Sequence, residues 1–175
     1  TKPCFGHDPN QNLPANKIFE KFNLPTLGES KPIGFYAKGC LSGGVQLSDT
    51  GPNWQIMRPS RNRNWGHPSV ISYIKDLSKS ATQIGWKGLY IGDIAAPRGG
   101  PMPYGHQSHQ TGLDVDIWLT PPKSLTLTKK ERDKIKAVSV RKKNLKEVNN
   151  NWTLNHAKIL KAAASDNRVD RIFIN

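Results

Sequence analysis

The sequence contains no long apolar run: none of its stretches reaches the roughly 18 apolar residues that a membrane-spanning helix needs. The first residues, TKPCFGHDPN, lack the apolar segment of a signal peptide, although an exported protein looks the same after processing. Internal repeats and low-complexity linkers are also missing. We therefore expect neither a membrane span nor a repeat architecture. A length of 175 residues with 35% hydrophobic residues and five Trp suffices for one globular domain.

Cysteine is scarce, with only Cys4 and Cys40 in the chain. Neither has a second metal-ligating residue at C-x-x-C spacing, which argues against a cysteine-based structural zinc site. A disulfide between the two would contribute roughly 3–4 kcal/mol in the chain-entropy model. Two cysteines do not by themselves decide whether that bond forms.

Acidic residues are also few: 13 Asp and Glu accompany 26 Lys and Arg, which gives a net charge of +13 and a pI of about 9.9. Such a charge attracts polyanions, whether nucleic acid, anionic lipid or acidic cell-wall polymers. The excess is densest at 123–146, where ten basic residues accompany only Glu131 and Asp133. This segment is either a solvated basic surface or a docking face for an anionic polymer. No groove-contacting motif is present, so we expect no nucleic-acid partner.

The middle of the chain alternates between helical and extended patterns. Apolar residues at helical spacing predict a helix over 69–82, with Gly85 as its stop. Alternation over 88–93 predicts a strand, and the Pro- and Gly-rich residues 95–105 predict a loop. A second alternating stretch over 113–118 predicts a strand with one apolar face and one acidic face.

The two ends of the chain show weaker patterns. Residues 1–33 predict an irregular N-terminal arm with at most a short helix near 16–22. The capping-box pattern that starts at Thr128 predicts a basic helix. A further helix is expected over 153–164, with Leu154, Ala157 and Leu160 on one face, and a final strand over 169–174. Together these elements predict an α+β domain over 34–175, with a central antiparallel or mixed sheet and flanking helices.

The segment 104–119, YGHQSHQTGLDVDIWL, contains the most specific chemical pattern. His109 and Asp116 stand seven residues apart, and a turn at Gly112 would fold the histidine back over the strand that carries the aspartate. Imidazole and carboxylate are common zinc ligands, and a catalytic zinc site needs three protein ligands and one open position. Taken alone the pair is weak evidence, because a polar loop histidine and a turn carboxylate have the same spacing.

The stretch GHQSHQTGLDVDIWL resembles the zinc-site motif of the penicillin-insensitive murein endopeptidases. These belong to a wider group with the lysostaphin-type peptidases, the D-Ala-D-Ala metallopeptidases and the hedgehog signalling domains. The group shares a His, a Gly three residues on and an Asp seven residues on, here His109, Gly112 and Asp116. Further similar segments follow the same order: AKGC (37–40), QIMRPSRNRNWGHP (55–68), LYIGDIAAPRGG (89–100) and VDRIFIN (169–175). The resemblance covers about 34–175, with 123–150 the least similar part.

The resemblance implies a hedgehog/D-Ala-D-Ala-peptidase-like fold and a Zn2+-dependent D,D-endopeptidase. Its substrate would be the peptidoglycan cross-link between D-Ala of one stem peptide and diaminopimelate of the next. His109 and Asp116 would be zinc ligands. The family's third ligand is the last His of a later H-x-H pair, whose first His assists the reaction. This chain has no H-x-H. We therefore expect the domain 34–175 to lack its C-terminal portion, and the natural protein to continue beyond Asn175.

Other polar residues gain candidate roles from the same resemblance. His106 is expected in the cleft, either as a catalytic group that contacts substrate or as support for the ligands. Asp114 could support the site, compete as a ligand or contact substrate. Three arginines precede the predicted helix and could bind the carboxylates of diaminopimelate and D-Ala. Surface charge or structural pairing explains any one of them equally well: Arg58, Arg61 and Arg63.

Four residues receive other expectations. His67 precedes a proline at a predicted helix start, so a structural role is favoured. Asp93, at the end of a predicted strand, either enters the site or caps the loop. His156 is expected on a helix surface. In the family a cysteine like Cys40 pairs with one in the later portion, which leaves Cys4 as the available partner here.

Two classes of function follow from these expectations. The first is an exported, periplasmic zinc endopeptidase of peptidoglycan, which cleaves through a metal-activated water and whose signal peptide is not in this sequence. The alternative is a non-catalytic, zinc-stabilised module that binds cell wall or protein, as hedgehog-type domains exemplify. The sequence does not fix the oligomeric state, and a homodimer stays open.

Overall fold

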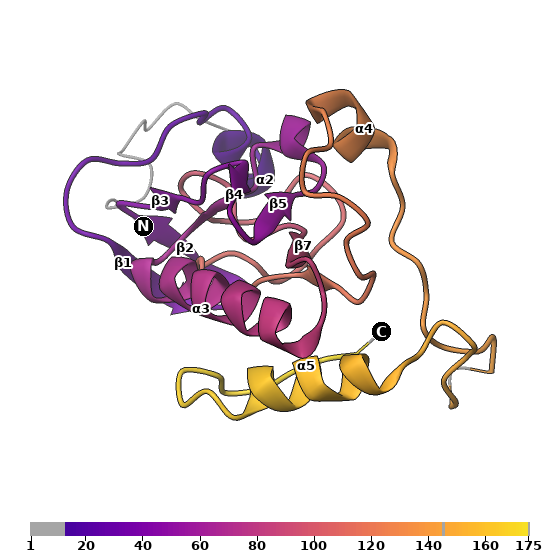
Figure 1. Ribbon diagram of the computed structural model, residues 1–175. Coiled ribbons are helices and arrows are strands. Elements are labelled where there is room, and N and C mark those ends of the chain that lie inside the picture. The colour runs from indigo at the N-terminus through magenta and orange to yellow at the C-terminus, as the bar shows by residue number, and fades with distance from the viewer. Residues whose placement is uncertain (1–12, 145, 175) are drawn as a thin grey trace.

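The computed structural model describes residues 13–144 and 146–174 (Figure 1). It combines helices with short strands, which confirms the predicted α+β class. The elements follow in this order: α2 (Ala15–Phe19), β1 (Lys31–Phe35), β2 (Lys38–Ser42), β3 (Val45–Gln46), β4 (Thr50–Gly51), β5 (Trp54–Ile56), η1 (Pro59–Arg61), β6 (Trp65–Gly66), α3 (Pro68–Ile84), β7 (Leu89–Ile91), β8 (Ile117–Trp118), α4 (Lys129–Lys134) and α5 (Leu154–Ala164).

The central sheet is mixed and has the strand order β4-β5-β7-β8. Strands β5 and β7 run parallel, and the outer strands pair antiparallel with them. Every residue of β5 and β7 is buried, as expected for the middle of a covered sheet. Parallel strands need a long crossover, which α3 provides. The predicted mixed sheet is thus confirmed, while the hedgehog-like fold stays a prediction.

Helix α3 covers the sheet because its apolar residues recur at helical spacing. The buried residues on this helix are Val70, Ile71, Ile74, Leu77, Ser78 and Ala81. His67 is its N-cap and accepts a hydrogen bond from the Ser69 N–H through its ring, so the expected structural role of His67 is confirmed. The helix ends at Gly85, whose φ of 104° is the left-handed conformation typical of a C-cap.

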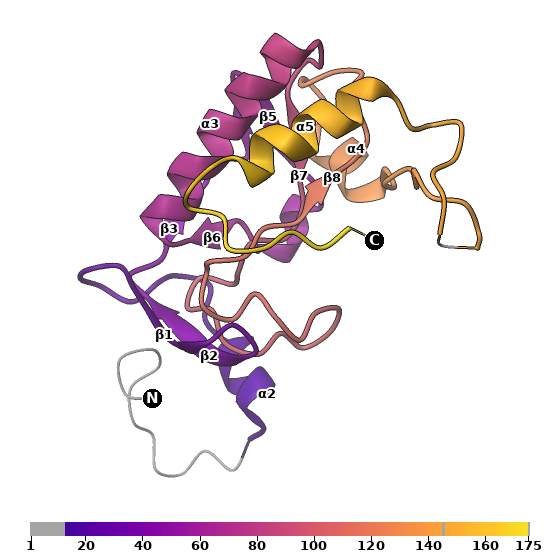
Figure 2. The same ribbon diagram turned by 90° about the horizontal axis from the view of Figure 1, so that it is seen from below.

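Helix α5 lies alongside α3, as both ribbon views show (Figures 1 and 2). Its existence is confirmed, but the predicted apolar face is wrong. His156, Ile159 and Ala163 are buried, whereas Leu154 is 70% exposed. His156 is not on the surface but 0% exposed, because its two ring nitrogens are satisfied by protein groups. The buried face of α5 therefore differs from the predicted one, because it includes His156, whose hydrogen bonds are all made within the protein.

Two predicted strands are wrong in extent. Of 113–118 only Ile117–Trp118 forms a strand, because the preceding residues turn to support His109. Residues 169–174 form no strand, and the apolar side chains of Ile172, Phe173 and Ile174 are exposed, with Phe173 at 81%. A strand needs a neighbour for its backbone groups, and no described strand pairs with this segment.

The N-terminal part is more ordered than expected. The predicted short helix occurs as α2, whose Phe19 is buried. Strand β1 begins at Lys31, inside the segment predicted to be irregular, and forms a hairpin with β2. Cys40 lies on β2 and is 5% exposed, whereas Cys4 and the proposed Cys4–Cys40 pairing fall outside the described residues. Within the described residues, no helix combines the length and apolar character needed to cross a bilayer.

Candidate metal centre

The site is built on residues 92–94, which continue strand β7. The Gly92 N–H donates to the Asp116 carbonyl at 2.7 Å, and the Asp116 N–H donates to the Asp93 carbonyl at 2.9 Å. This antiparallel pair extends the β7–β8 ladder and fixes the backbone of Asp116. A Cβ at Gly92 would lie 3.0 Å from the Asp116 Cβ, so glycine permits the close approach. The sheet edge therefore sets the position of the first candidate ligand.

His109 lies in a loop that folds back toward the same edge. Its φ of 64° is left-handed, and its backbone N–H donates to the Asp114 Oδ2 at 3.0 Å. Gly112, with φ of 71°, makes the expected turn, and its carbonyl accepts from the His67 N–H. The His109 side chain is 5% exposed. Asp114 thus stabilises an otherwise unfavourable backbone conformation that aims His109 at Asp116.

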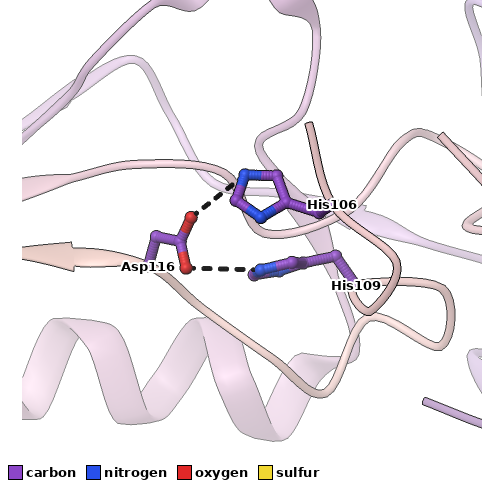
Figure 3. Close-up of side chains that lie close together, drawn as sticks. All are labelled: His106, His109 and Asp116. Atoms are coloured by element: carbon purple, nitrogen blue, oxygen red, sulfur yellow. Dashed lines mark ion pairs between the residues drawn. The ribbon is translucent and has the colours of Figure 1, made fainter. Parts of the chain in front are cut away.

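His106, His109 and Asp116 converge on one point (Figure 3). The His109 Nε2 is 3.3 Å from the Asp116 Oδ1, and the His106 Nε2 is 3.4 Å from the Asp116 Oδ2. The two imidazole centroids are 4.7 Å apart. One candidate donor atom from each residue lies within 4.8 Å of the others. The sequence prediction that a turn brings the His109 and Asp116 side chains together is confirmed.

The tautomer of His109 suits a metal. Its Nδ1 is 2.8 Å from the Ile94 carbonyl, and since a carbonyl only accepts, Nδ1 carries the hydrogen. In the neutral ring Nε2 then has a lone pair that faces the Asp116 carboxylate. Two acceptors repel unless a proton or a cation lies between them. Ligand atoms about 2.0–2.1 Å from a tetrahedral zinc are about 3.3 Å apart, so the observed separation fits such an ion.

The charges in the cluster shift the pKa values of His109 and Asp116 so that both side chains favour their charged forms. Burial lowers the pKa of His109, but its hydrogen bond with Asp116 and the charges of Asp116 and Asp114 outweigh burial and raise it. Burial raises the pKa of Asp116, yet the hydrogen bond and charge of His109, with the charges of His106 and Arg61, lower it overall. A site that stabilises a proton on His109 in this way also stabilises a metal cation in its place.

Behind the cluster lies Asp93, which is 4% exposed. Its Oδ2 accepts hydrogen bonds from the Arg61 Nη1 at 2.9 Å and the Arg63 Nη1 at 2.8 Å, and lies 3.4 Å from the His106 Nε2. Of the two expectations for Asp93, entry into the site is the one that the geometry supports. The side chain of Arg61 is 27% exposed, whereas that of Arg63 is 5% exposed.

The three arginines therefore differ. Arg63 also donates to the Tyr104 carbonyl at 3.1 Å and lies 4.5 Å from the centroid of the Tyr104 ring, so it anchors the loop that precedes His106. Of the two arginines that contact Asp93, Arg61 is the more exposed to solvent. Arg58 precedes η1 with a left-handed φ of 57°, and its backbone N–H donates to the Arg132 carbonyl. Among the described contacts, none joins the Arg58 side chain to the cluster.

The mixed sheet and the cluster at its edge define a small α+β protein with a candidate metal centre. Residues 32–175 match the sequence family described as penicillin-insensitive murein endopeptidase. A protein of that name from Haemophilus influenzae is 39% identical over 148 residues, which cover 85% of this chain. Proteins of that name from Salmonella paratyphi B and Salmonella newport are 38% identical over 158 residues, or 90% of this chain.

The chain belongs to the penicillin-insensitive murein endopeptidase family, as its sequence predicted. It spans 52% of the length of the Haemophilus relative and 57% of each Salmonella relative.

Proposed function

We propose that this chain carries the reaction centre of a zinc-dependent D,D-endopeptidase that hydrolyses D-Ala–diaminopimelate cross-links of peptidoglycan in the periplasm. One observation supports this most directly: His106, His109 and Asp116 present donor atoms within 4.8 Å of one another in a member of a murein endopeptidase family. When bound, zinc would lower the pKa of its water and polarise the scissile carbonyl.

We assign different roles to the three residues of the cluster. His109 and Asp116 are the ligand pair, because a backbone hydrogen bond orients each of them. The side chain of His106 is 31% exposed and faces the second oxygen of Asp116, so it can contact a substrate at the ligand pair. We assign to His106 a hydrogen bond to the reacting amide and the transfer of a proton there.

Arg61 is the arginine best placed to bind a substrate carboxylate. Its Nη1 contacts Asp93, and its partly exposed side chain leaves further donors that can form charge-assisted hydrogen bonds. Diaminopimelate supplies such a carboxylate next to the scissile bond. We assign no substrate contact to Arg58, and we assign supporting roles to Arg63 and Asp114, whose side chains bind the loop around the histidines.

A catalytic zinc takes three protein ligands, and this proposal names two. The family resemblance assigns the third to a histidine outside this sequence, and we retain that assignment. The competing arrangement makes His106 the third ligand, since its nitrogen is also close to Asp116. Metal content of a His106→Ala variant separates the two arrangements, because only the second predicts loss of zinc.

The test of the proposed function uses the full-length protein and purified cross-linked muropeptide dimers. We expect zinc-dependent conversion of dimers to monomers, abolished by a chelator, restored by zinc and absent in Asp116→Ala. Asp76→Asn is the matched control, because Asp76 is an exposed carboxylate on α3 that pairs with Arg168. If the zinc-loaded protein binds the dimers but does not cleave them, this proposal is wrong and the protein is a non-catalytic binding module.

A further inference from the structure

One carboxylate oxygen behind the cluster collects three nitrogen-containing side chains. The Asp93 Oδ2 lies 2.9 Å from the Arg61 Nη1, 2.8 Å from the Arg63 Nη1 and 3.4 Å from the His106 Nε2. These residues come from the loop around η1 and from the loop before His109. A carboxylate that served only to neutralise one arginine would need one such neighbour, whereas the Asp93 Oδ2 has three.

The main chain of Asp93 connects to the ligand pair as well. Its carbonyl accepts from the Asp116 N–H, and the next carbonyl, that of Ile94, pairs with the His109 ring. Residues 92–94 therefore fix the ligand pair through the backbone, whereas the side chain of Asp93 contacts His106 and the arginines. The two sets of contacts are separable by mutation, because Asp93→Asn leaves the backbone bonds in place.

Besides Asp93, the His106 ring contacts the Asp116 carboxylate at 3.4 Å and, edge-on, the His109 ring, with the two centroids 4.7 Å apart. His106 follows Gly105, whose φ is 99°, and the residues before it form a Pro- and Gly-rich loop. Arg63 links Asp93 to the loop that precedes His106, since it donates to both the Asp93 Oδ2 and the Tyr104 carbonyl. Removing the negative charge at Asp93 would thus loosen the loop and leave His106 with Asp116 as its remaining ion-pair partner.

We infer that Asp93 is a positioning residue that holds His106 and Arg61 beside the ligand pair, so that His106 serves the reaction rather than the metal. The inference rests on the proposed function for the reaction, but the positioning itself is a property of the metal-free protein. Asp93 would act on substrate through these two side chains, not by contact.

The molecule contains a useful structural counterpart in Asp49. Its Oδ2 lies 3.6 Å from the Arg132 Nη2, and its Oδ1 accepts from the Asn64 Nδ2 at 3.3 Å. Like Asp93 it fixes an arginine, but it has no contact with a histidine among the described residues. Asp49→Asn therefore controls for the loss of a carboxylate–arginine pair away from the cluster.

The first test is histidine-selective 15N–1H NMR on the metal-free full-length protein. Asp93→Asn should shift the ring signals of His106, while His67 and His156 keep their wild-type positions and report an intact fold. Asp49→Asn should leave the His106 signals in place. Unchanged His106 signals in a folded Asp93→Asn protein would overturn the inference, whether or not the protein is a hydrolase.

If Asp93→Asn disturbs the His156 signals as well, Arg63→Gln tests the same connection from the other side. The inference then requires His106 to shift while His67 and His156 do not. An unmoved His106 in that variant contradicts the inference.

The second test is kinetic and uses the zinc-loaded protein. Asp93→Asn should keep its zinc and lower kcat at least about tenfold, a fraction of what a general acid or base contributes. In a His106→Ala background the same change should lower kcat by a smaller factor than in the wild-type protein, because only the part that acts through Arg61 remains. Multiplicative effects would contradict the inference. Absence of hydrolysis by the wild-type protein would instead contradict the proposed function and leave the NMR result to decide the inference.

Discussion

Two buried histidines of this protein make similar hydrogen bonds but differ in what their second nitrogen faces. His109 pairs its Nδ1 with the Ile94 carbonyl at 2.8 Å, and His156 pairs its Nε2 with the Leu119 carbonyl at 3.1 Å. The other nitrogen of His156 accepts from the Thr153 N–H at 3.0 Å. The other nitrogen of His109 faces the Asp116 carboxylate at 3.3 Å.

This difference separates a structural histidine from a candidate ligand. Neutral groups satisfy both nitrogens of His156, and Trp86 and Trp152 pack against its ring. His109 leaves one lone pair opposite an anion, which favours a cation between them. Burial therefore does not distinguish the two residues, whereas the partner of the second nitrogen does. The following variants test whether that distinction holds in solution.

The largest expected effect is loss of metal from the ligand pair. His109→Ala and Asp116→Ala should each weaken zinc binding by at least about 100-fold, because each removes a direct ligand and ligand loss exceeds the cost of removing supporting contacts. Isothermal titration of the full-length protein measures the affinity, with Asp76→Asn as the control. Stoichiometric tight binding by either variant would remove that residue from the ligand set.

The next effect concerns turnover without metal loss. His106→Ala should keep stoichiometric zinc and lower kcat by about 100-fold or more, in line with the contribution of a positioned proton-transfer group. Metal analysis and hydrolysis of muropeptide dimers provide the two measurements. Loss of zinc together with activity would show that His106 is a ligand, and unchanged turnover would place it outside the reaction.

A smaller, graded effect is expected from pH. The raised pKa of His109 means that protons compete with zinc for Nε2, so zinc affinity should fall as pH decreases through that pKa. If one proton competes with each zinc ion, the zinc affinity decreases by about tenfold for each pH unit below the pKa of His109. Zinc titrations between about pH 8 and about pH 5 would detect it. A flat profile over that range contradicts the assigned role of His109.

The smallest effect on the metal is expected at His156. His156→Ala should lower the free energy of unfolding by about 1–3 kcal/mol, because it leaves the Leu119 carbonyl and the Thr153 N–H without their partner. Zinc affinity should stay at the wild-type value. Denaturant unfolding and zinc titration of the same sample check both statements. Weaker zinc binding by the folded variant would contradict the distinction between His156 as a structural histidine and His109 as a ligand.

Local patterns predicted much of the fold. The period of apolar residues and the caps at His67 and Gly85 specify α3, and the capping box at Thr128 specifies α4. The turn at Gly112 was predictable because only glycine adopts left-handed backbone without cost. The side chains of His109 and Asp116 accordingly meet where the sequence places them.

Long-range contacts explain the predictions that were wrong. His156 was expected on the surface because its hydrogen-bond partner, the Leu119 carbonyl, is 37 positions away in the chain. The strand expected over 169–174 depends on a neighbouring strand, and an apolar pattern carries no information about that neighbour. The central place of Asp93 likewise depends on Arg61 and Arg63, which reach it from 32 and 30 positions away. The sequence offered one signal for it, a carboxylate at the end of a strand.

The most direct test of the account is a zinc anomalous-difference map from crystals of the full-length protein grown with zinc. The account predicts one strong peak within bonding distance, about 2.0–2.2 Å, of both the His109 Nε2 and an Asp116 carboxylate oxygen. His106 should lie next to that peak but against Asp93, beyond bonding distance. A peak bound elsewhere, or none at His109 and Asp116, would contradict the account.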